Sequence, residues 1–271
     1  MTHLVPTLDH AVINVRDRVD AAAEAFQGLG FTLTPRGYHT LGSMNHLAMF
    51  GTDYLELIAA KPGDTSRPEI MGAPEGLDGL VFGTEDAVET FAAMERAEVP
   101  VFPYGEFSRP VELPGGPRDA IFRTVRLKPD PLLPGRLYFC QHLTRNLVWR
   151  DEWRHHPNGV TGIARAVIVG GAPLAELFAR MFGEDAVRAI EGGHSLTVGL
   201  SRFDILTPAA VWTEFGDAAP EARGRRTYMA ALEFRTRSLE AAAAATGGWL
   251  EGSRVVVPAS AAFGATLAFS L

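Results

Sequence analysis

Short apolar runs, separated by glycine and proline, recur along the whole chain. The first run, residues 8–15, is apolar and rich in β-branched residues, which favours a strand. Residues 18–27 place their apolar side chains on one helical face, and Gly28 and Gly30 are expected to end that helix. Three short strands are predicted to follow, at 31–35, 45–50 and 54–59. The opening 60 residues therefore predict one βαβββ unit.

The same order of elements is predicted three more times. These units open with strands at 77–82, 163–169 and 229–235. Thr84 is expected to cap the second helix, Pro173 suits the first turn of the third, and Gly183 ends it. The remaining predicted strands lie at 99–102, 120–127, 137–141, 186–190, 195–200, 203–206, 254–257 and 265–270. An insertion at 104–118, rich in proline and glycine, is predicted to be a loop that acts as a lid.

Four modules predict an α+β protein with two domains, because two βαβββ modules pair into one curved mixed sheet around a pocket. The boundary is expected in a polar stretch at 150–157, which is followed by Asn158 and Gly159. The N-terminal domain would then span 1–150 and the C-terminal domain 151–271.

Composition narrows the class of protein. The 271 residues are 46% hydrophobic and 21% charged, which is typical of a globular chain, and the net charge of −7 argues against nucleic acid as a partner. No apolar run approaches the roughly 18 residues that a membrane span needs. A single cysteine, Cys140, excludes an intrachain disulfide, and the N-terminus lacks the pattern of a signal peptide. A cytoplasmic location is expected.

Two motifs at the ends of the first unit carry a family resemblance. The segments Leu8-Asp-His10-Ala-Val-Ile and Tyr54-Leu-Glu56-Leu-Ile-Ala resemble those of the vicinal-oxygen-chelate superfamily, which contains glyoxalases, bleomycin-resistance proteins and extradiol dioxygenases. The segment from Phe139 to Gly159 is similar to a glyoxalase-like-domain subgroup within it.

The resemblance implies a divalent metal ion in the cup of a module pair, held by His or Gln from opening strands and by Glu or Gln from closing strands. Such a cation stabilises negative charge that develops on the substrate. Carried over, the ligands are His10 and Glu56 from the first module and Gln141 from the second, where Gly79 replaces the opening ligand. Strand alternation independently turns His10 and Glu56 to the cupped face. Glu56 is also the expected general base.

Other residues are expected to position the substrate. A three-residue turn after the strand at 45–50 would turn His46 into the pocket, whereas a two-residue turn would choose Asn45, and the sequence leaves both open. Arg123 and Arg126 lie in one predicted strand of the second module and face opposite sides, so one of them, with Arg123 the choice, could hold an anionic substrate.

The second half departs further from the ligand pattern. Arg165 takes the place that matches His10, and Asp204 takes the place that matches Glu56. An ion pair between them is expected, which makes the C-terminal half structural or an interface.

The leading hypothesis is a divalent-metal-dependent lyase or isomerase that acts on a small oxygenated metabolite such as a keto-aldehyde or a hydroxy acid. The identity of the metal is open. One alternative is a metal-free protein that binds or sequesters a small molecule, as bleomycin-resistance proteins do. An extradiol-dioxygenase-like enzyme ranks below both, and a homodimer is a further possibility.

Overall fold

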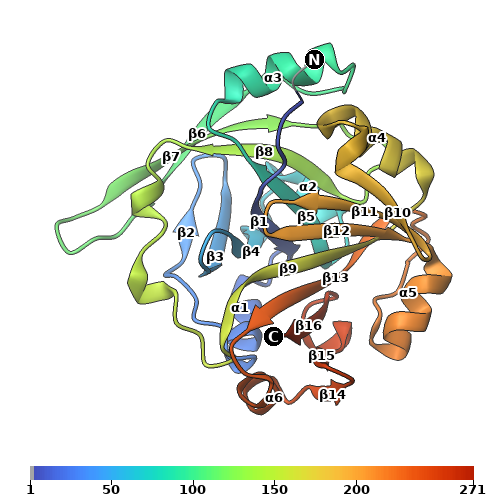
Figure 1. The fold of residues 1–271 in the computed structure, drawn as a ribbon. Helices are drawn as coiled ribbons and strands as arrows, with labels where there is room; N and C mark the ends of the chain where they lie inside the picture. The colour runs from blue at the N-terminus through green and yellow to red at the C-terminus, as the bar shows by residue number, and fades with distance from the viewer. Residues whose placement is uncertain (1–2) are drawn as a thin grey trace.

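The computed structural model describes residues 3–271, which form two eight-stranded mixed sheets with few helices (Figure 1). The first sheet is built by two modules. The first module consists of β1 (Leu8–Asn14), α1 (Val19–Gly28), β2 (Gly37–Tyr38), β3 (Ser43–Met49) and β4 (Tyr54–Ala60). The second, after the short helix α2 (Pro68–Gly72), consists of β5 (Gly76–Gly83), α3 (Ala87–Arg96), β6 (Gly105–Val111), β7 (Arg118–Arg126) and β8 (Arg136–His142).

The second sheet repeats this plan. Its modules are β9 (Val160–Val169), α4 (Ala172–Phe182), β10 (Val187–Ile190), β11 (Gly193–Val198) and β12 (Ser201–Leu206), then, after α5 (Pro208–Phe215), β13 (Tyr228–Thr236), α6 (Leu239–Thr246), β14 (Trp249–Glu251), β15 (Arg254–Val257) and β16 (Thr266–Ser270). The strand orders, β2-β3-β4-β1-β5-β8-β7-β6 and β10-β11-β12-β9-β13-β16-β15-β14, correspond one to one. The predicted α+β fold of four βαβββ modules is confirmed.

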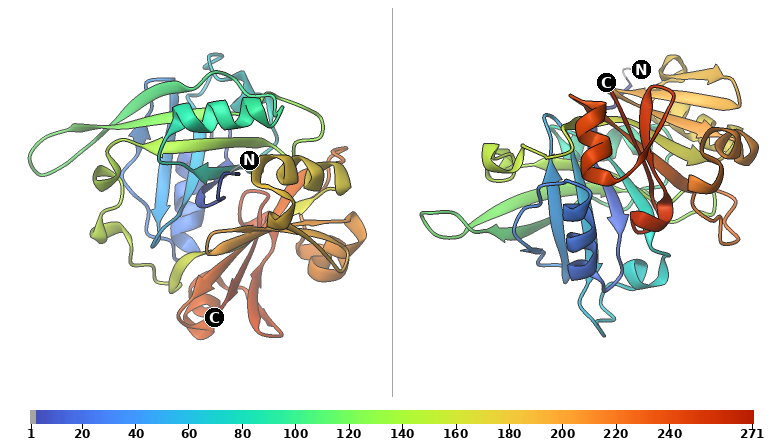
Figure 2. Two further views of the ribbon diagram at one scale, coloured as in Figure 1. Left: turned by 45° about the horizontal axis from the view of Figure 1, so that its top comes forward. Right: turned by 90° about the horizontal axis from the view of Figure 1, so that it is seen from below.

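The first sheet curls until its two edges meet. The backbone N–H of Thr40, just after β2, donates to the carbonyl of Ser108 in β6 at 3.0 Å. The N–H of Ser108 donates to Thr40 Oγ1 at 3.3 Å. This contact nearly closes a barrel around the inner face of the sheet, while the tip of the β6–β7 hairpin projects beyond the rest of the molecule in both views of Figure 2.

The two sheets share one hydrophobic core. Phe31, which follows α1, lies with its ring centroid 5.4 Å from that of Phe234 in β13 and 6.2 Å from that of Phe269 in β16. The same apolar cluster continues through α4 and α6. Residues 143–159 connect the sheets and contain the 3-10 turns η1 (Arg145–Leu147) and η2 (Asp151–Trp153). The division into domains 1–150 and 151–271 stays a prediction, since the halves are packed through this common core.

Four local predictions were wrong. The strand expected at 99–102 is reduced to an isolated bridge between Val101 and Leu127. Residues 31–35 form no strand, and the second strand of the module is β2 instead. The insertion at 104–118 is not a lid loop, because 105–111 forms β6 and pairs with β7 along its whole length. Helix α3 is capped by Asp86, whose side chain accepts hydrogen bonds from the N–H groups of Val88 and Glu89, and not by Thr84.

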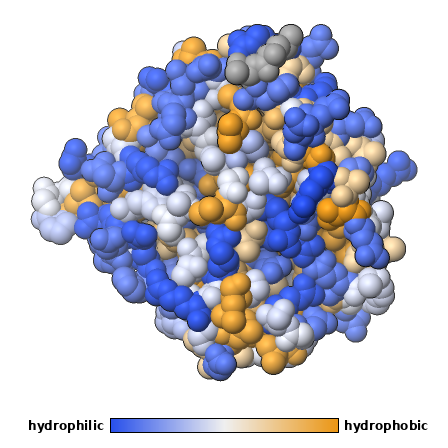
Figure 3. All heavy atoms as spheres, viewed as in Figure 1, coloured by the Kyte–Doolittle hydropathy of each residue, from blue (hydrophilic) through white to orange (hydrophobic). Residues whose placement is uncertain are grey.

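Within the described residues, no helix is both long and apolar enough to cross a membrane. On the face drawn in Figure 3, hydrophobic residues form small groups separated by hydrophilic ones. That face of the described chain therefore offers no broad apolar patch for a second copy, and a homodimer stays a prediction.

Candidate active site

A cavity of about 630 Å³ lies on the inner face of the first sheet. Strands from both modules line it, because the residues at alternate positions of each strand point to this face. Part of the lining is aromatic or aliphatic and includes Phe102, Phe107, Phe122 and Leu133. The rest is densely polar and includes His10, His39, Asn45, Glu56, Arg109 and Arg136.

His10 and Glu56 meet in this polar part. Strands β1 and β4 are parallel with Val12 opposite Glu56, which sets the His10 and Glu56 side chains diagonally on one face. Nε2 of His10 lies 3.6 Å from Oε2 of Glu56, and both side chains are buried. The His10 ring stacks on Tyr54, with centroids 4.3 Å apart. The structure thus brings together the two ligand residues expected from the first module.

Asp9 holds His10 from behind. A register shift between Leu8 and His10 bulges the strand, and Asp9 Oδ2 lies 2.6 Å from His10 Nδ1. Burial acts to raise the pKa of Asp9, but the neighbouring His142 and His10 outweigh it and hold this pKa well below its usual range. Asp9 is therefore a charged acceptor for the Nδ1–H of His10. This contact fixes the tautomer, and it leaves the Nε2 lone pair directed at the cavity.

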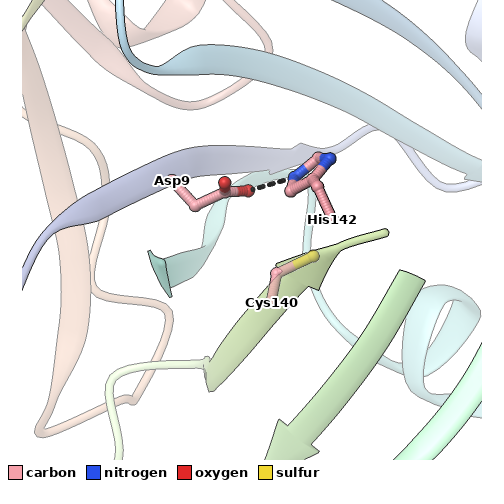
Figure 4. Close-up of side chains that lie close together, drawn as sticks. All are labelled: Asp9, Cys140 and His142. Carbon is pink, nitrogen blue, oxygen red and sulfur yellow. Dashed lines mark hydrogen bonds and ion pairs between the residues drawn. The ribbon is translucent and has the colours of Figure 1, made fainter. Parts of the chain in front are cut away.

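Asp9, Cys140 and His142 form a second group of potential ligands, drawn in Figure 4. Their ligand atoms all lie within 4.8 Å of one another, so the group could hold a metal ion. His142 Nε2 donates to Asp9 Oδ2 at 3.0 Å, the same oxygen that accepts from His10. Burial raises the pKa of the Cys140 thiol well above its usual value, which keeps it protonated. These contacts favour a supporting role for Asp9 behind His10.

Asn45, and not His46, faces the cavity. Strands β3 and β4 are joined by a tight turn in which Phe50 bonds Asp53, and Leu47 lies opposite Glu56. This register corresponds to the shorter of the two turns that the sequence left open. Nδ2 of Asn45 donates to Glu56 Oε1 at 2.6 Å. The His46 side chain instead bonds the backbone carbonyl of Thr34, so its expected role in the pocket was wrong.

His39 was missed by the sequence analysis. It lies in the short connection between β2 and β3, where no periodic pattern marks a side chain as inward. Its Nε2 lies 3.3 Å from Asn45 Nδ2, and its Nδ1 lies 2.8 Å from Ser43 Oγ. Burial lowers its pKa to about 4; Glu56 acts in the opposite direction, while Arg109 and Arg67 lower it further. His39 is therefore neutral near pH 7, with Nε2 as an acceptor at the cavity surface.

Arg123 does not reach the cavity. It lies in the exposed β6–β7 hairpin, and its Nε donates to Glu106 at 2.9 Å. The arginines of the second module that line the cavity are Arg109 from β6, Arg126 from β7 and Arg136 from β8. Arg123 was therefore wrongly expected in the pocket, and Arg109 was overlooked because 104–118 was taken for a loop.

Gln141 is also misplaced. Its side chain donates to the carbonyl of Glu85 at 2.5 Å and accepts from the N–H of Ala87, at the start of α3 and away from His10. Along β8 the inward positions are Arg136, Tyr138, Cys140 and His142. Tyr138 lies opposite Val81 as Glu56 lies opposite Val12, so Tyr138 is the true counterpart of Glu56. Its hydroxyl lies 3.1 Å from His10 Nε2.

Comparisons with known proteins identify the family of the chain. The family model described as a glyoxalase-like domain matches residues 8–195, which is more than half of the chain. The chain belongs to the glyoxalase-like domain family. This confirms the resemblance to the vicinal-oxygen-chelate superfamily. No curated protein sequence matches the chain.

Solved structures share the fold of this glyoxalase-like protein. A hypothetical protein from Staphylococcus aureus is 13% identical, with a TM-score of 0.70 over 98% of this chain and 99% of the other. A mutant of 4-hydroxymandelate synthase from Streptomyces coelicolor is 16% identical, with a TM-score of 0.52 over 91% and 75%. A xylose isomerase-like TIM barrel/4-hydroxyphenylpyruvate dioxygenase fusion protein is 16% identical, with a TM-score of 0.53. The match covers 91% of this chain and 39% of the fusion protein. At these identities the likeness concerns the fold alone.

The corresponding place in the C-terminal half of the glyoxalase-like protein is filled by ion pairs. Arg165 and Asp204 occupy the positions that match His10 and Glu56, and the predicted ion pair between them forms. Arg165 also bonds Glu214, and Ser195 Oγ donates to Asp204 at 2.6 Å. The guanidinium therefore neutralises the carboxylates that would otherwise attract a cation.

The N-terminal donor set fits a divalent cation held by two side chains. Ligand atoms on one cation, at bond lengths of about 2.0–2.2 Å, lie about 3.0–3.5 Å apart, so the 3.6 Å between His10 Nε2 and Glu56 Oε2 needs little adjustment. Burial acts to raise the pKa of Glu56, but His10, His39 and the bond from Asn45 outweigh it and lower it, which keeps the carboxylate charged. The second module would add no carboxylate or imidazole at the matching positions, because these are Gly79 and Tyr138.

Proposed function

We propose that this protein is a divalent-metal-dependent enzyme of the lyase or isomerase type that acts on a small oxygenated metabolite in the first-sheet cavity. The observation that carries the proposal is the pair of His10 Nε2 and Glu56 Oε2, 3.6 Å apart on the cavity wall, with Asp9 fixing the other nitrogen of His10. A carboxylate behind a ligating histidine is the usual support of a protein metal site.

His10 and Glu56 would hold the cation, which when bound supplies a Lewis-acid contact to a substrate oxygen. The chain's own residues account for the proton transfers. Glu56 is charged near neutral pH and can accept a substrate proton at a carboxylate oxygen that the cation leaves free. Burial raises the pKa of Tyr138 well above its usual value, so its hydroxyl remains a hydrogen-bond donor beside the reacting atoms. Asn45 orients Glu56 through the bond at 2.6 Å.

A metal-free binding protein is the second candidate, because the second module contributes Gly79 and Tyr138 where further ligands would be expected. A protein of this kind would use the apolar part of the cavity and require no cation. A dioxygenase, the activity named for two of the structural neighbours, is supported less, since the C-terminal site is occupied by the Arg165 ion pairs.

The test is the metal content of protein purified without chelator, followed by titration with Mn²⁺, Co²⁺ and Zn²⁺. Wild type is expected to carry near-stoichiometric metal, and His10→Ala and Glu56→Gln are expected to fall to background. His46→Ala is the matched control, because His46 lies beside Asn45 but points away from the cavity. Wild type that binds none of these ions when folded would refute the metal-dependent function and leave the binding protein.

A further inference from the structure

One buried arginine of the cavity wall has no acidic partner. Arg109 is 4% exposed and points inward from β6 between Phe107 and Val111. Of the other arginines that line the cavity, Arg67 pairs with Glu69 at 2.6 Å and Arg136 pairs with Asp78 at 3.0 Å. Arg126 is exposed and lies over the ring of Phe102. Within residues 3–271, no carboxylate lies within ion-pair distance of the Arg109 guanidinium. Arg109 therefore brings one uncompensated positive charge into the cavity wall.

A buried and unpaired guanidinium is unfavourable for the folded chain by itself. Burial lowers the pKa of Arg109, and only the more distant Tyr54 and Glu56 act against this effect. A charge in such a place is expected to meet an anion that is not part of the chain.

The fold makes room for this side chain. A Cβ on Gly37 would stand 2.7 Å from Arg109 Nη1 and 2.5 Å from Asn45 Oδ1, so only glycine lets both groups occupy this corner. Asn45 Oδ1 is buried without a hydrogen-bond partner. Nη2 of Arg136 is likewise buried and unpartnered, although Nε of the same group bonds Asp78. Open donors from two guanidinium groups therefore line the cavity that also holds Glu56 and His10.

We propose that Arg109, assisted by the open edge of Arg136, binds a carboxylate of the substrate, and that the cavity takes small monocarboxylates with an apolar body. A guanidinium matches a planar carboxylate through two parallel hydrogen bonds. The single uncompensated charge of Arg109 balances one carboxylate better than it balances a phosphate dianion. The apolar body would lie against Phe107 and Phe122, whose rings line the same cavity. The carboxylate would thus be bound by arginine and not by a cation.

This subsite rests on the proposed function only in that the cavity is the substrate site, and it can be tested without metal. Benzoate is titrated into the full chain by calorimetry, with and without chelator. Benzamide serves as the neutral isostere and inorganic phosphate as the competing anion. Arg109→Gln is compared with Arg123→Gln, which removes the same charge from the same hairpin outside the cavity.

Benzoate is expected to bind wild type and Arg123→Gln equally and to bind Arg109→Gln at least about tenfold more weakly. Benzamide should bind weakly to all three. Ligand-free Arg109→Gln is expected to have an unchanged or raised Tm, because an unpaired buried charge is removed, whereas a purely structural arginine would lower the Tm. Equal benzoate affinity in Arg109→Gln, no benzoate binding by wild type, or Arg109-dependent binding of phosphate in preference to benzoate would each overturn the assignment.

The same titration in Glu56→Gln separates the two proposals. Arg109-dependent benzoate binding that persists in this variant and in chelated protein supports the carboxylate subsite, even if wild type proves to contain no metal. Loss of benzoate binding in wild type after chelation would instead show that the carboxylate lies on the cation, and would contradict the subsite.

Discussion

The replacement Asp53→Asn is expected to change how the stability of the protein depends on pH. Asp53 is 2% exposed, at the turn between β3 and β4. One carboxylate oxygen accepts from the N–H of Ile163 at 2.9 Å, whereas the nearest cation, Arg235 in β13, is 3.9 Å away. Burial, with a smaller contribution from Asp9, raises the pKa of Asp53 from 3.8 to about 6 despite these contacts.

The magnitude follows from proton linkage. The folded chain holds the Asp53 proton more tightly than the unfolded chain, so its contribution to stability is fully present below pH 3.8 and is lost as the pH rises through about 6. A shift of about two pH units corresponds to about 3 kcal/mol over the whole range, of which roughly 2 kcal/mol falls between pH 4.5 and 7.5. Asparagine stays neutral and avoids this loss. The free energy of unfolding of Asp53→Asn should therefore rise relative to wild type as the pH increases.

The assay is urea unfolding of both proteins at half-unit steps between pH 4.5 and 7.5. All other titrating groups are common to the pair, so their contributions cancel in the difference. Asp17→Asn, an exposed carboxylate in the turn before α1, is the control and should give a nearly constant difference. A difference between wild type and Asp53→Asn that is equally constant would refute the reasoning, because it would mean that burial of Asp53 does not oppose its charge.

Two further replacements test the packing and the support of the site. Phe31→Ala should lower the free energy of unfolding by about 3–5 kcal/mol, because Phe31 packs on Phe234 in the other sheet. Calorimetry should still show one unfolding transition. Two separate transitions would contradict a core that both sheets share. Asp9→Asn should weaken metal binding about 10–100-fold in titrations, because the carboxylate that fixes His10 is lost. An unchanged affinity for the metal would contradict this role and would mean that Asp9 supports only His142.

The order of elements could be predicted because it depends on local signals. Strands of four to ten residues carry apolar runs, helices carry one apolar face, and glycines such as Gly183 (φ 92°) end the helices. His10 and Glu56 were predicted to face the cavity for the same reason, since both lie in strands whose neighbours are clearly apolar. Local patterns of this kind predict on which face of the sheet a side chain lies. They do not predict which strand pairs with it.

The errors in the predicted site arise at positions whose orientation depends on the register between paired strands. The turn length between β3 and β4 selects Asn45 over His46, and one residue more would have reversed the choice. In β8 the amide of Gln141 suggested a ligand, but the pairing with β5 makes Tyr138 the counterpart of Glu56. Arg109 was overlooked because prolines and glycines around β6 resembled a loop. The closure of the sheet and the missing partner of Arg109 both depend on which strands meet at its edges, and the sequence pattern does not give this.

A comparison of the two halves is informative, because each has a buried carboxylate at the equivalent position and the neighbouring charges differ. In the C-terminal half, the buried carboxylate of Asp204 is balanced by Arg165, which also binds Glu214. In the N-terminal half, Glu56 occupies the same place, and its neighbour His10, at 3.6 Å, directs the proton on Nδ1 to Asp9 and a lone pair on Nε2 to the cavity. Among residues 3–271, no arginine forms an ion pair with Glu56, and Arg136 acts on it only from a greater distance. We propose that a bound divalent cation supplies this contact, and this difference is why we place the chemistry in the N-terminal half.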